Sequence, residues 1–257
     1  MEKTLEKVTV IIPCHNEEKG IGKVLDSMPF KRLAHHGFDV QVVVVDNNSK
    51  DLTKEEVRKR NIKIIHEPKQ GKGQALKTGF LAVPEDSKYV VILDGDNTYK
   101  PEEMPRLLEP LQNNFADVIV GSRIGGKTIR GSLTSSHRFV NWVFAFMVRH
   151  FYGANITDCL SGYFAFKREA LNKLLNHLDS KGFAIEMEMI TKMRKMNMHV
   201  YSVPITYDRR LGYSKIHSLS DGIKILYTFF NNLTWSAKKS HENNLRLGRN
   251  LPVQQRG

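Results

Sequence analysis

Apolar runs rich in β-branched residues recur along the first half of the chain, and each is followed by a segment of helical character. Strands that are apolar on both faces occur in parallel sheets covered by helices on both sides. The predicted strands cover residues 8–12, 40–45, 62–65, 89–93 and 117–120, and the predicted helices cover residues 17–28, 51–60, 73–83 and a segment opened by Pro101. The pattern therefore predicts an α/β fold with a mostly parallel central sheet.

Polar clusters follow four of these predicted strands at the point where each strand ends. In open parallel sheets, ligands bind beyond the carboxyl ends of the strands. Each cluster alone is also compatible with an ordinary turn, but together they predict a binding site at one sheet edge. The clusters are Pro13-Cys14-His15-Asn16-Glu17, Asp46-Asn47-Asn48-Ser49, Asp94-Gly95-Asp96 and Gly121-Ser122-Arg123.

The segment Asp94-Gly95-Asp96 carries the clearest chemical signal. Side chains alternate along an extended segment, so Asp94 and Asp96 share a face. Two carboxylates on one face repel each other unless a cation lies nearby, and Mg²⁺ or Mn²⁺ is the expected occupant. Gly95 would let such a ligand approach the backbone closely. The alternative is a polar Asp-Gly turn, and the neighbouring clusters favour the metal site.

The composition favours one domain with a strongly basic surface. The chain has 257 residues, 40% of them hydrophobic, and a net charge of +12, which predicts attraction to nucleic acid, anionic lipid or phosphorylated substrates. No acidic residue occurs between Asp117 and Asp158, whereas Arg123 and Arg138 fall in that span. We expect a single catalytic domain at residues 1–235 and a basic, disordered tail at residues 236–257.

Two later segments predict helices with large apolar faces. Residues 139–152 are apolar almost all round, and residues 219–233 form an amphipathic stripe. Such helices either pack into a domain or lie on a membrane surface, and a basic tail adds to the second interpretation. No apolar run is long enough to span a bilayer, and residues 1–7 lack a secretory signal. Cys14 and Cys159 are expected to be free thiols in the cytoplasm.

Seven motifs in order along the chain resemble those of family 2 glycosyltransferases, and among them the short dolichyl-phosphate (polyprenyl-phosphate) mannose or glucose synthases without transmembrane helices. The motifs are Pro13-Cys14-His15-Asn16-Glu17, Asp46, Gly71-Lys72-Gly73-Gln74-Ala75, Asp94-Gly95-Asp96, Gly121-Ser122-Arg123, Asp158-Cys159-Leu160-Ser161-Gly162-Tyr163 and Gly212-Tyr213-Ser214-Lys215. The resemblance implies a GT-A fold, a divalent metal (Mg²⁺ or Mn²⁺), a GDP- or UDP-linked sugar donor and inversion at the anomeric carbon. After Asp96, Asn97-Thr98-Tyr99 replaces the family's usual Leu-Gln-His.

Carried over residue by residue, the resemblance implies a donor half at residues 8–122 and an acceptor- and membrane-facing half at residues 123–235. The metal would be held mainly by Asp96, with Asp94 beside it. The donor pocket would be lined by Pro13, Asn16, Glu17, Asp46, Lys72, Gly73, Asp94 and Gly95. The acceptor phosphate would be held by Arg123 and Arg138, and donor diphosphate or acceptor phosphate by Arg209 and Lys215.

The expected acceptor is dolichyl or polyprenyl phosphate. A phosphate monoester, whose second pKa is about 6, is largely ionised near neutrality and needs no general base. A glycan hydroxyl, the alternative acceptor, would need one, and the candidates are Asp158, Glu186 and Glu188. The sequence leaves mannose, glucose and N-acetylglucosamine open. We expect a protein bound peripherally to the cytoplasmic face of a membrane.

Two other classes of protein share some of these sequence features. The positive charge is also compatible with a nucleic-acid-binding module, but no nucleic-acid motif is present and no such partner is expected. A sugar nucleotidyltransferase shares the predicted fold, but its Gly-rich first loop is replaced by Pro13-Cys14-His15-Asn16-Glu17.

Overall fold

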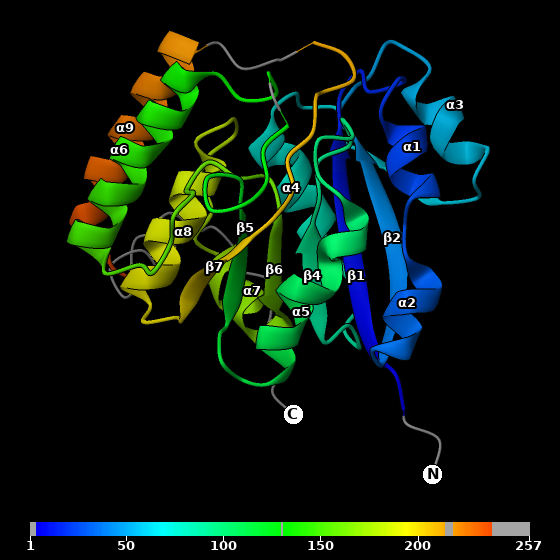
Figure 1. Ribbon diagram of the computed structural model, residues 1–257, viewed down its shortest axis with the longest axis horizontal. Helices are drawn as coiled ribbons and strands as arrows, with labels where there is room; N and C mark the ends of the chain where they lie inside the picture. The colour runs from blue at the N-terminus through cyan, green and yellow to red at the C-terminus, as the bar shows by residue number, and fades with distance from the viewer. Residues whose placement is uncertain (1–3, 130, 214–217, 238–257) are drawn as a thin grey trace, which may run out of the picture.

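The structure is a computed structural model that describes residues 4–129, 131–213 and 218–237. A seven-stranded sheet forms its middle layer, and helices pack on both faces (Figure 1). The strands are β1 (Glu6–Cys14), β2 (Phe38–Asp46), β3 (Lys63–His66), β4 (Tyr89–Ile92), β5 (Val118–Ser122), β6 (Phe164–Lys167) and β7 (Val200–Pro204). The helices are α1 (Ile21–Asp26), α2 (Phe30–His35), α3 (Thr53–Arg58), α4 (Lys72–Leu81), η1 (Pro101–Glu103), α5 (Met104–Gln112), α6 (Ser135–Tyr152), α7 (Arg168–Leu175), α8 (Ile185–Lys195) and α9 (Ser218–Leu233).

The strand order is β3-β2-β1-β4-β6-β5-β7, and only β6 runs antiparallel to its neighbours in this sheet. In register, Val10 of β1 lies opposite Val42 of β2 and Val91 of β4. The carboxyl ends of β1, β2, β4 and β5 therefore meet at one edge, where the antiparallel β6 presents its beginning. The predicted mostly parallel α/β sheet is confirmed.

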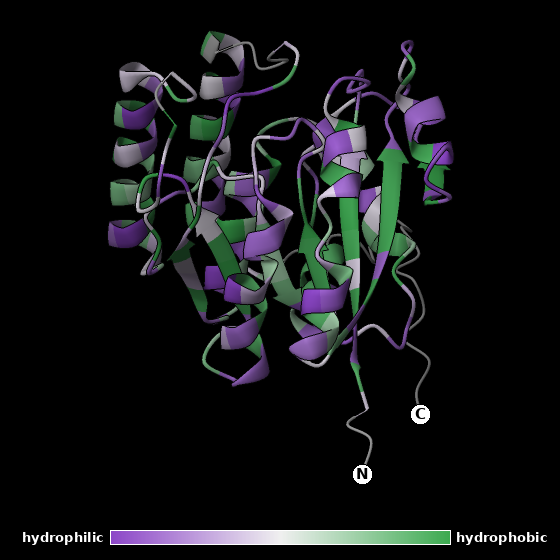
Figure 2. Ribbon diagram, turned by 45° about the vertical axis from the view of Figure 1, so that its right-hand side comes forward, coloured by the Kyte–Doolittle hydropathy of each residue, from purple (hydrophilic) through white to green (hydrophobic). Residues whose placement is uncertain are grey.

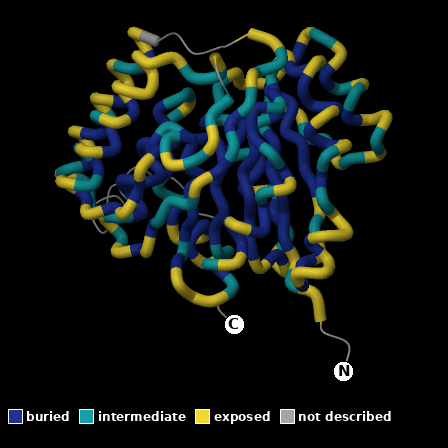
Figure 3. The backbone as a smooth tube through the Cα atoms, viewed as in Figure 1, coloured by how far each residue is buried: buried dark blue, intermediate teal, exposed yellow. Residues whose placement is uncertain are grey.

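The two faces of the sheet are covered by separate apolar clusters, as expected for strands that alternate between faces. Ile11 points into one cluster, and its neighbours Val10 and Ile12 point into the other. The first cluster includes residues of α4, α6, α7, α8 and α9, and the second includes residues of α1, α2, α3 and α5. The strands β1, β4, β5 and β6 in the middle of the sheet are accordingly buried over most of their length (Figure 3).

The first predicted helix is shorter than expected. It begins at Ile21 and not at Glu17. The backbone N–H of Glu17 donates to Thr53 Oγ1 at 2.8 Å, and that of Glu18 donates to Asp51 Oδ2 at 3.1 Å. Side chains of a neighbouring loop therefore satisfy these amides, and Glu17 is held at the end of β1 beside the sheet edge.

Helices α6 and α9 lie side by side at one end of the sheet (Figure 1). Thr134 caps the start of α6 by accepting the His137 N–H, and Gly153 ends it in the left-handed conformation. Among the described residues, none of the helices has the length and apolar character needed to cross a membrane.

Several large apolar side chains of α6 and α9 are exposed, and the ribbons of both helices carry hydrophobic segments between hydrophilic ones (Figure 2). We call the surface that these side chains form the α6/α9 face. The ring planes of Trp142 and its neighbours Phe139 and Phe146 are stacked along α6. The face consists of Phe139, Val140, Trp142, Phe146 and Phe151 from α6 and Leu219, Ile223, Leu226, Tyr227 and Phe230 from α9. Each helix buries its other side in the core, so the predicted packing into the domain is confirmed. The membrane-surface interpretation stays a prediction.

Candidate functional site

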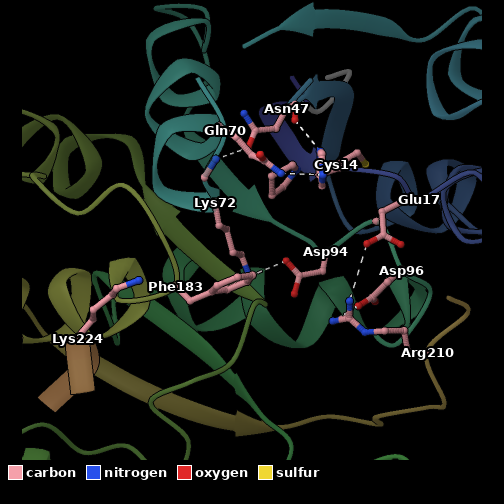
Figure 4. A pocket seen from close by; sticks show the side chains of 15 residues that line it. Cys14, Glu17, Asn47, Gln70, Lys72, Asp94, Asp96, Phe183, Arg210 and Lys224 are labelled. Atoms are coloured by element: carbon pink, nitrogen blue, oxygen red, sulfur yellow. Dashed lines mark hydrogen bonds and ion pairs between the residues drawn. The ribbon is translucent and has the colours of Figure 1, made fainter. Parts of the chain in front are cut away.

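A pocket of about 710 Å³ lies at the edge where the parallel strands end (Figure 4). Residues at the ends of β1, β2 and β4 line it, and so do the start of α4 and residues from the second half of the chain. The lining residues are Pro13, Cys14, His15, Glu17, Asn47, Gln70, Gly71, Lys72, Ala75, Asp94, Gly95, Asp96, Phe183, Arg210 and Lys224. Three of the four polar clusters predicted to share one sheet edge thus contribute to one cavity, whereas the fourth, Gly121-Ser122-Arg123, does not line it.

Lys72 joins two acidic side chains at the floor of this pocket. Its Nζ lies 2.8 Å from Asp94 Oδ1 and 2.7 Å from Glu186 Oε1. Burial by itself would lower the pKa of Lys72, but the two carboxylates raise it above its ordinary value, so the amine stays charged. Burial raises the pKa of Glu186, an effect that Lys72 opposes.

Asp96 is buried, and both of its carboxylate oxygens have partners. Oδ1 accepts hydrogen bonds from the Thr98 N–H at 3.0 Å and the Thr98 hydroxyl at 2.6 Å. Oδ2 lies 2.6 Å from Nη2 of Arg210, whose Nη1 lies 3.8 Å from Glu17 Oε1. Burial would lower the pKa of Arg210, but Asp96, Asp94 and Glu17 raise it. Thr98 therefore fixes the orientation of Asp96, and Arg210 neutralises it.

The glycines around the site are required mainly by neighbouring protein atoms. A Cβ on Gly95 would lie 2.5 Å from Cys14 Sγ. A Cβ on Gly162, at the loop before β6, would lie 2.1 Å from Asp94 Oδ2. A Cβ on Gly71 or Gly73 would lie 2.2 Å from the carbonyl oxygen of Lys181 or Ser180, respectively. Gly73 thus serves loop packing, and this same loop brings Phe183 into the pocket.

The far end of the pocket holds a hydrogen-bonded group of His15, Asn47 and Gln70. His15 Nδ1 lies 2.8 Å from the Asn47 carbonyl oxygen, which can only accept, so Nδ1 donates. His15 Nε2 is therefore the acceptor for the Gln70 amide at 2.8 Å. Asn47 also accepts the Gly71 N–H at 2.7 Å. This group ties the end of β1 to the turn before α4.

Three residues predicted for the donor pocket do not line it: Asn16, Asp46 and Gly73. Asp46 is fully buried and accepts from the Ser49 N–H at 3.2 Å, with His66 Nδ1 3.1 Å from its other oxygen. Asn16 adopts a positive φ of 51°, and its side chain accepts the Lys50 N–H at 2.8 Å. Neither side chain lines the cavity. Both shape the loops that do.

Arg123 is engaged in a buried ion pair. Its Nε and Nη2 lie 2.7 Å and 2.9 Å from the two carboxylate oxygens of Asp158, and Asn141 donates to the same carboxylate at 2.8 Å. Its guanidinium also lies 5.3 Å from the ring centre of Tyr207. The geometry gives Arg123 the role of joining β5 to the loop before β6, and it does not line the pocket.

Two further predicted cations, Arg138 and Arg209, lie apart from the pocket wall. Arg138 is exposed on α6, and Arg209 is exposed in the segment after β7. Neither lines the pocket, whereas Arg210, the residue after Arg209, does. Lys215 lies outside the described residues.

Comparison with known proteins identifies the family. The family model described as "Glycosyl transferase family 2" matches residues 9–175. The chain belongs to glycosyltransferase family 2. This glycosyltransferase is 30% identical over 225 residues to the undecaprenyl-phosphate mannosyltransferase of Micrococcus luteus, covering 82% of this chain and 87% of that protein. It is 31% identical over 226 residues to the dolichyl-phosphate hexose transferase of Haloferax volcanii, covering 87% and 92%.

A solved structure shows the same fold. Glucosyl-3-phosphoglycerate synthase from Mycobacterium tuberculosis, in complex with Mn²⁺, UDP and glucosyl-3-phosphoglycerate, superposes on the glycosyltransferase with a TM-score of 0.68 at 20% identity. The superposition covers 89% of this chain and 80% of that one. The glycosyltransferase therefore has the GT-A fold, which confirms the predicted fold class and the resemblance.

The carboxylates of the glycosyltransferase suit a cation that also binds phosphate. Asp94 and Asp96 line one cavity, and each already faces a positive side chain. Among the described residues, no group of three or more His, Cys, Asp or Glu side chains could hold a metal by itself. Mg²⁺ is often held by one or two carboxylates and completes its shell with water and substrate phosphates. The donor set therefore fits a divalent metal that arrives with a diphosphate.

Sequence reasoning did not assign several residues that line the pocket. His15 belongs to the first polar cluster, but only its neighbours Asn16 and Glu17 and the preceding Pro13 are predicted for the donor pocket. Arg210 directly follows Arg209, which is predicted to bind phosphate. Phe183 and Lys224 gave no local signal, since the loop before α8 and the helix α9 bring them to the site from far along the chain.

Proposed function

We propose that this glycosyltransferase transfers a hexose from a nucleotide-sugar donor to a polyprenyl phosphate, with inversion at the anomeric carbon. The observation that carries the proposal is the position of α9. Lys224 of α9 lines the pocket, whereas Ile223 and Tyr227 of the same helix are exposed on the apolar α6/α9 face. One helix therefore adjoins both a polar pocket and a surface suited to lipid. A lipid phosphate needs both environments at once.

The donor is a nucleotide sugar, and its diphosphate is expected near Asp94 and Asp96. These two carboxylates would hold Mg²⁺ or Mn²⁺, which when bound stabilises the negative charge of the departing diphosphate. A donor of this kind is supported by the Mn²⁺ and UDP named for the structurally similar synthase. Lys72 fixes the orientation of Asp94 through their ion pair at 2.8 Å.

The acceptor phosphate is already a nucleophile and needs no general base. The pairing of the carboxylates around the site is consistent with this. Asp158 is paired with Arg123, Glu188 with Lys192, and Glu186 with Lys72. All three candidate bases are thus held by cations, as structural carboxylates are. A hydroxyl acceptor would need a carboxylate within hydrogen-bond reach of the attacking oxygen.

In the proposed reaction, a phosphate oxygen of the acceptor attacks the anomeric carbon from the face opposite the diphosphate. The bond from that carbon to the diphosphate oxygen breaks, and its electron pair leaves with the nucleoside diphosphate. Because two anionic groups must approach each other, cations have to offset their repulsion. Lys224 and Arg210 line the pocket and can serve this purpose, and the phosphate contacts of Arg138, Arg209 and Lys215 stay predictions.

The proposal includes peripheral binding to the cytoplasmic face of a membrane through the α6/α9 face. Aromatic side chains favour the membrane–water interface, and Phe139, Trp142 and Tyr227 are all more than half exposed, at 64%, 52% and 69%. The names of the two relatives support a lipid-phosphate acceptor, since each names undecaprenyl or dolichyl phosphate.

The test is a donor and acceptor panel. The protein is incubated with Mg²⁺ or Mn²⁺, polyprenyl phosphate in vesicles, and GDP-mannose, UDP-glucose or UDP-N-acetylglucosamine in turn. Mass spectrometry of the lipid should show a single hexosyl phosphate product with one preferred donor. Polyprenol without phosphate and a free oligosaccharide serve as hydroxyl acceptors. Transfer to these, with none to polyprenyl phosphate, would overturn the proposal.

A further inference from the structure

The side chain of Arg210 occupies the position next to Asp96 where a metal would have to bind. Its Nη2 lies 2.6 Å from Asp96 Oδ2, and its Nη1 lies 3.8 Å from Glu17 Oε1. The other oxygen of Asp96 is held by Thr98. A metal on Asp96 Oδ2 would therefore have to displace Arg210.

We propose that Arg210 is an exchangeable counter-ion: it neutralises Asp96 and Glu17 before the metal arrives and moves to the donor diphosphate when metal and donor bind together. The inference rests on the proposed function only in taking Asp96 as a metal ligand and a diphosphate as part of the donor. It does not depend on which sugar is transferred or on the acceptor.

The backbone beside Arg210 is fixed, so only its side chain has to move. The Leu211 N–H donates to the Asp96 carbonyl at 3.1 Å, and the Asp208 N–H donates to the Thr98 carbonyl at 2.8 Å. Asp208 is also paired with Lys100 at 2.7 Å. These bonds tie the segment after β7 along the Asp96 loop, and a flexible side chain on a fixed backbone can exchange partners by rotation.

The charges in the pocket explain why the exchange would require the donor. Asp94 faces Lys72, and Asp96 and Glu17 face Arg210. A divalent cation alone would place two more positive charges beside these cations, and the arginine it displaced would lose its carboxylate partners. A diphosphate removes this conflict, because it gives both the metal and the guanidinium new anionic partners. Arginine suits this exchange, since its fork matches carboxylate and phosphate geometry equally well.

The proposal predicts opposite effects of one substitution on two ligands. In Arg210→Ala, Mn²⁺ alone should bind about tenfold more tightly, because the positive charge that repels the metal and competes for Asp96 is removed. A charge within about 4–6 Å changes the affinity of a carboxylate for a cation by that order or more. The Mn²⁺ complex of UDP or GDP should bind about tenfold more weakly, because a phosphate contact is lost. In the unsubstituted protein the nucleotide should strengthen Mn²⁺ binding, and the variant should lose most of this synergy.

The experiment is a Mn²⁺ titration followed by electron paramagnetic resonance, first without nucleotide and then with UDP or GDP. Arg58→Ala serves as the matched loss of one positive charge, because Arg58 is exposed on α3 beside Glu55. It should leave both affinities unchanged. Arg210→Lys keeps the charge but not the fork, so it should bind Mn²⁺ nearly as weakly as the unsubstituted protein. It also tests the idea by itself should the alanine variant not fold.

Equal or weaker binding of Mn²⁺ alone by folded Arg210→Ala would overturn the proposal, and so would an unchanged affinity for the Mn²⁺–nucleotide complex. If only Arg210→Lys folds, the proposal would be overturned by Mn²⁺ binding to this variant about tenfold more tightly than to the unsubstituted protein. These readouts involve neither the acceptor nor the glycosylated product, so a wrong acceptor in the proposed function would leave them interpretable.

Discussion

Lys72 is the residue on which the charge balance of the pocket floor depends. It neutralises Asp94 on one side and the buried Glu186 on the other, at 2.8 Å and 2.7 Å. Removing one partner of a buried ion pair is far more damaging than removing the whole pair, because a buried charge is left uncompensated. A double variant that removes Lys72 and a buried partner together can therefore distinguish the contribution of Lys72 to folding from its contribution to catalysis.

We expect Lys72→Met to lower the transfer rate by about 10²-fold, the usual loss when one preorganised electrostatic contact is removed. It should also lower the unfolding midpoint. The double variant Lys72→Met with Glu186→Gln should recover much of the stability without recovering the rate. Chemical denaturation and steady-state kinetics measure the two effects. Parallel recovery of rate and stability would mean that Lys72 acts only in folding.

The buried ion pair of Asp158 should make the stability of the protein depend on pH. Burial alone would raise the pKa of Asp158, but Arg123 and the surrounding hydrogen bonds hold it below its ordinary value. Its contribution is therefore fully present above the unfolded-state pKa of about 4 and is lost as the pH falls below it. Asp158→Asn should cost about 3–5 kcal/mol near pH 7, since Arg123 is left buried without its partner.

Urea denaturation at several pH values measures this effect. The difference between the unsubstituted protein and Asp158→Asn should shrink between about pH 5 and pH 2. Asp86→Asn is the matched control, because Asp86 is paired with Lys7 on the exposed surface and should contribute little. A difference that stays constant over this range would contradict the ion-pair explanation.

At the residue scale, the sequence predicted the positions at strand ends better than the cations. Pro13, Glu17, Asp94 and Asp96 all line the pocket, as expected of residues at the ends of parallel strands. Among the predicted cations that the structure describes, Lys72, the first residue of α4, also lines it. The arginines could not be placed in the same way. Between neighbours in an irregular segment, such as 209 and 210, no periodicity says which side chain turns inward. Their assigned phosphate contacts stay predictions.

At the element scale, the strands β6 and β7 had not been predicted. They have four and five residues, and β6 lies between β4 and β5, which are far from it in the chain. Their length is not the reason, because β4 and β5 also have four and five residues and were predicted. Each of those two strands carries three consecutive β-branched residues, whereas β6 and β7 have no such run. β6 and β7 are therefore defined by their neighbours in the sheet and not by a local pattern.

The exposed aromatic side chains of the α6/α9 face should contribute to binding lipid vesicles. We expect Trp142→Glu and Tyr227→Glu each to weaken binding to lipid vesicles by about tenfold or more, since burying one large apolar side chain is worth about 1.5–3 kcal/mol. Vesicle co-sedimentation measures the effect, and activity on a short-chain, water-soluble polyprenyl phosphate should change little.

The control is Leu81→Glu on α4, since Leu81 is an exposed apolar residue of comparable accessibility, at 66%. It should bind vesicles as the unsubstituted protein does. Equal losses in all three variants would indicate a general effect of added negative charge and would count against a specific membrane-binding face.

At the scale of the whole molecule, the net charge of +12 should make membrane binding depend on lipid charge and salt. Each Lys or Arg near an anionic surface contributes about 1 kcal/mol at low salt. Binding to anionic vesicles should therefore exceed binding to neutral ones several-fold at 50 mM NaCl, and the excess should largely disappear at 0.5 M, where the Debye length is only a few ångströms. Salt-independent binding would assign the attraction to the aromatic side chains alone.

The whole fold was predictable in class because continuous apolar strands and intervening helices leave few alternatives to a covered parallel sheet. The division into halves at residues 8–122 and 123–235 remains a prediction. The predicted tail at residues 236–257 lies almost entirely outside the described residues. The position of Lys224 in the pocket could not be predicted in this way, because it depends on how α9 packs against the rest of the folded molecule.

The contact between Gly95 and Cys14 has an evolutionary consequence. Since a methyl group at position 95 would meet the Cys14 sulfur at 2.5 Å, the two positions are not free to drift separately. In related chains, alanine at position 95 should coincide with a smaller residue than cysteine at position 14. The two loops that carry these positions would then change in step across the family, although about eighty residues of chain separate them.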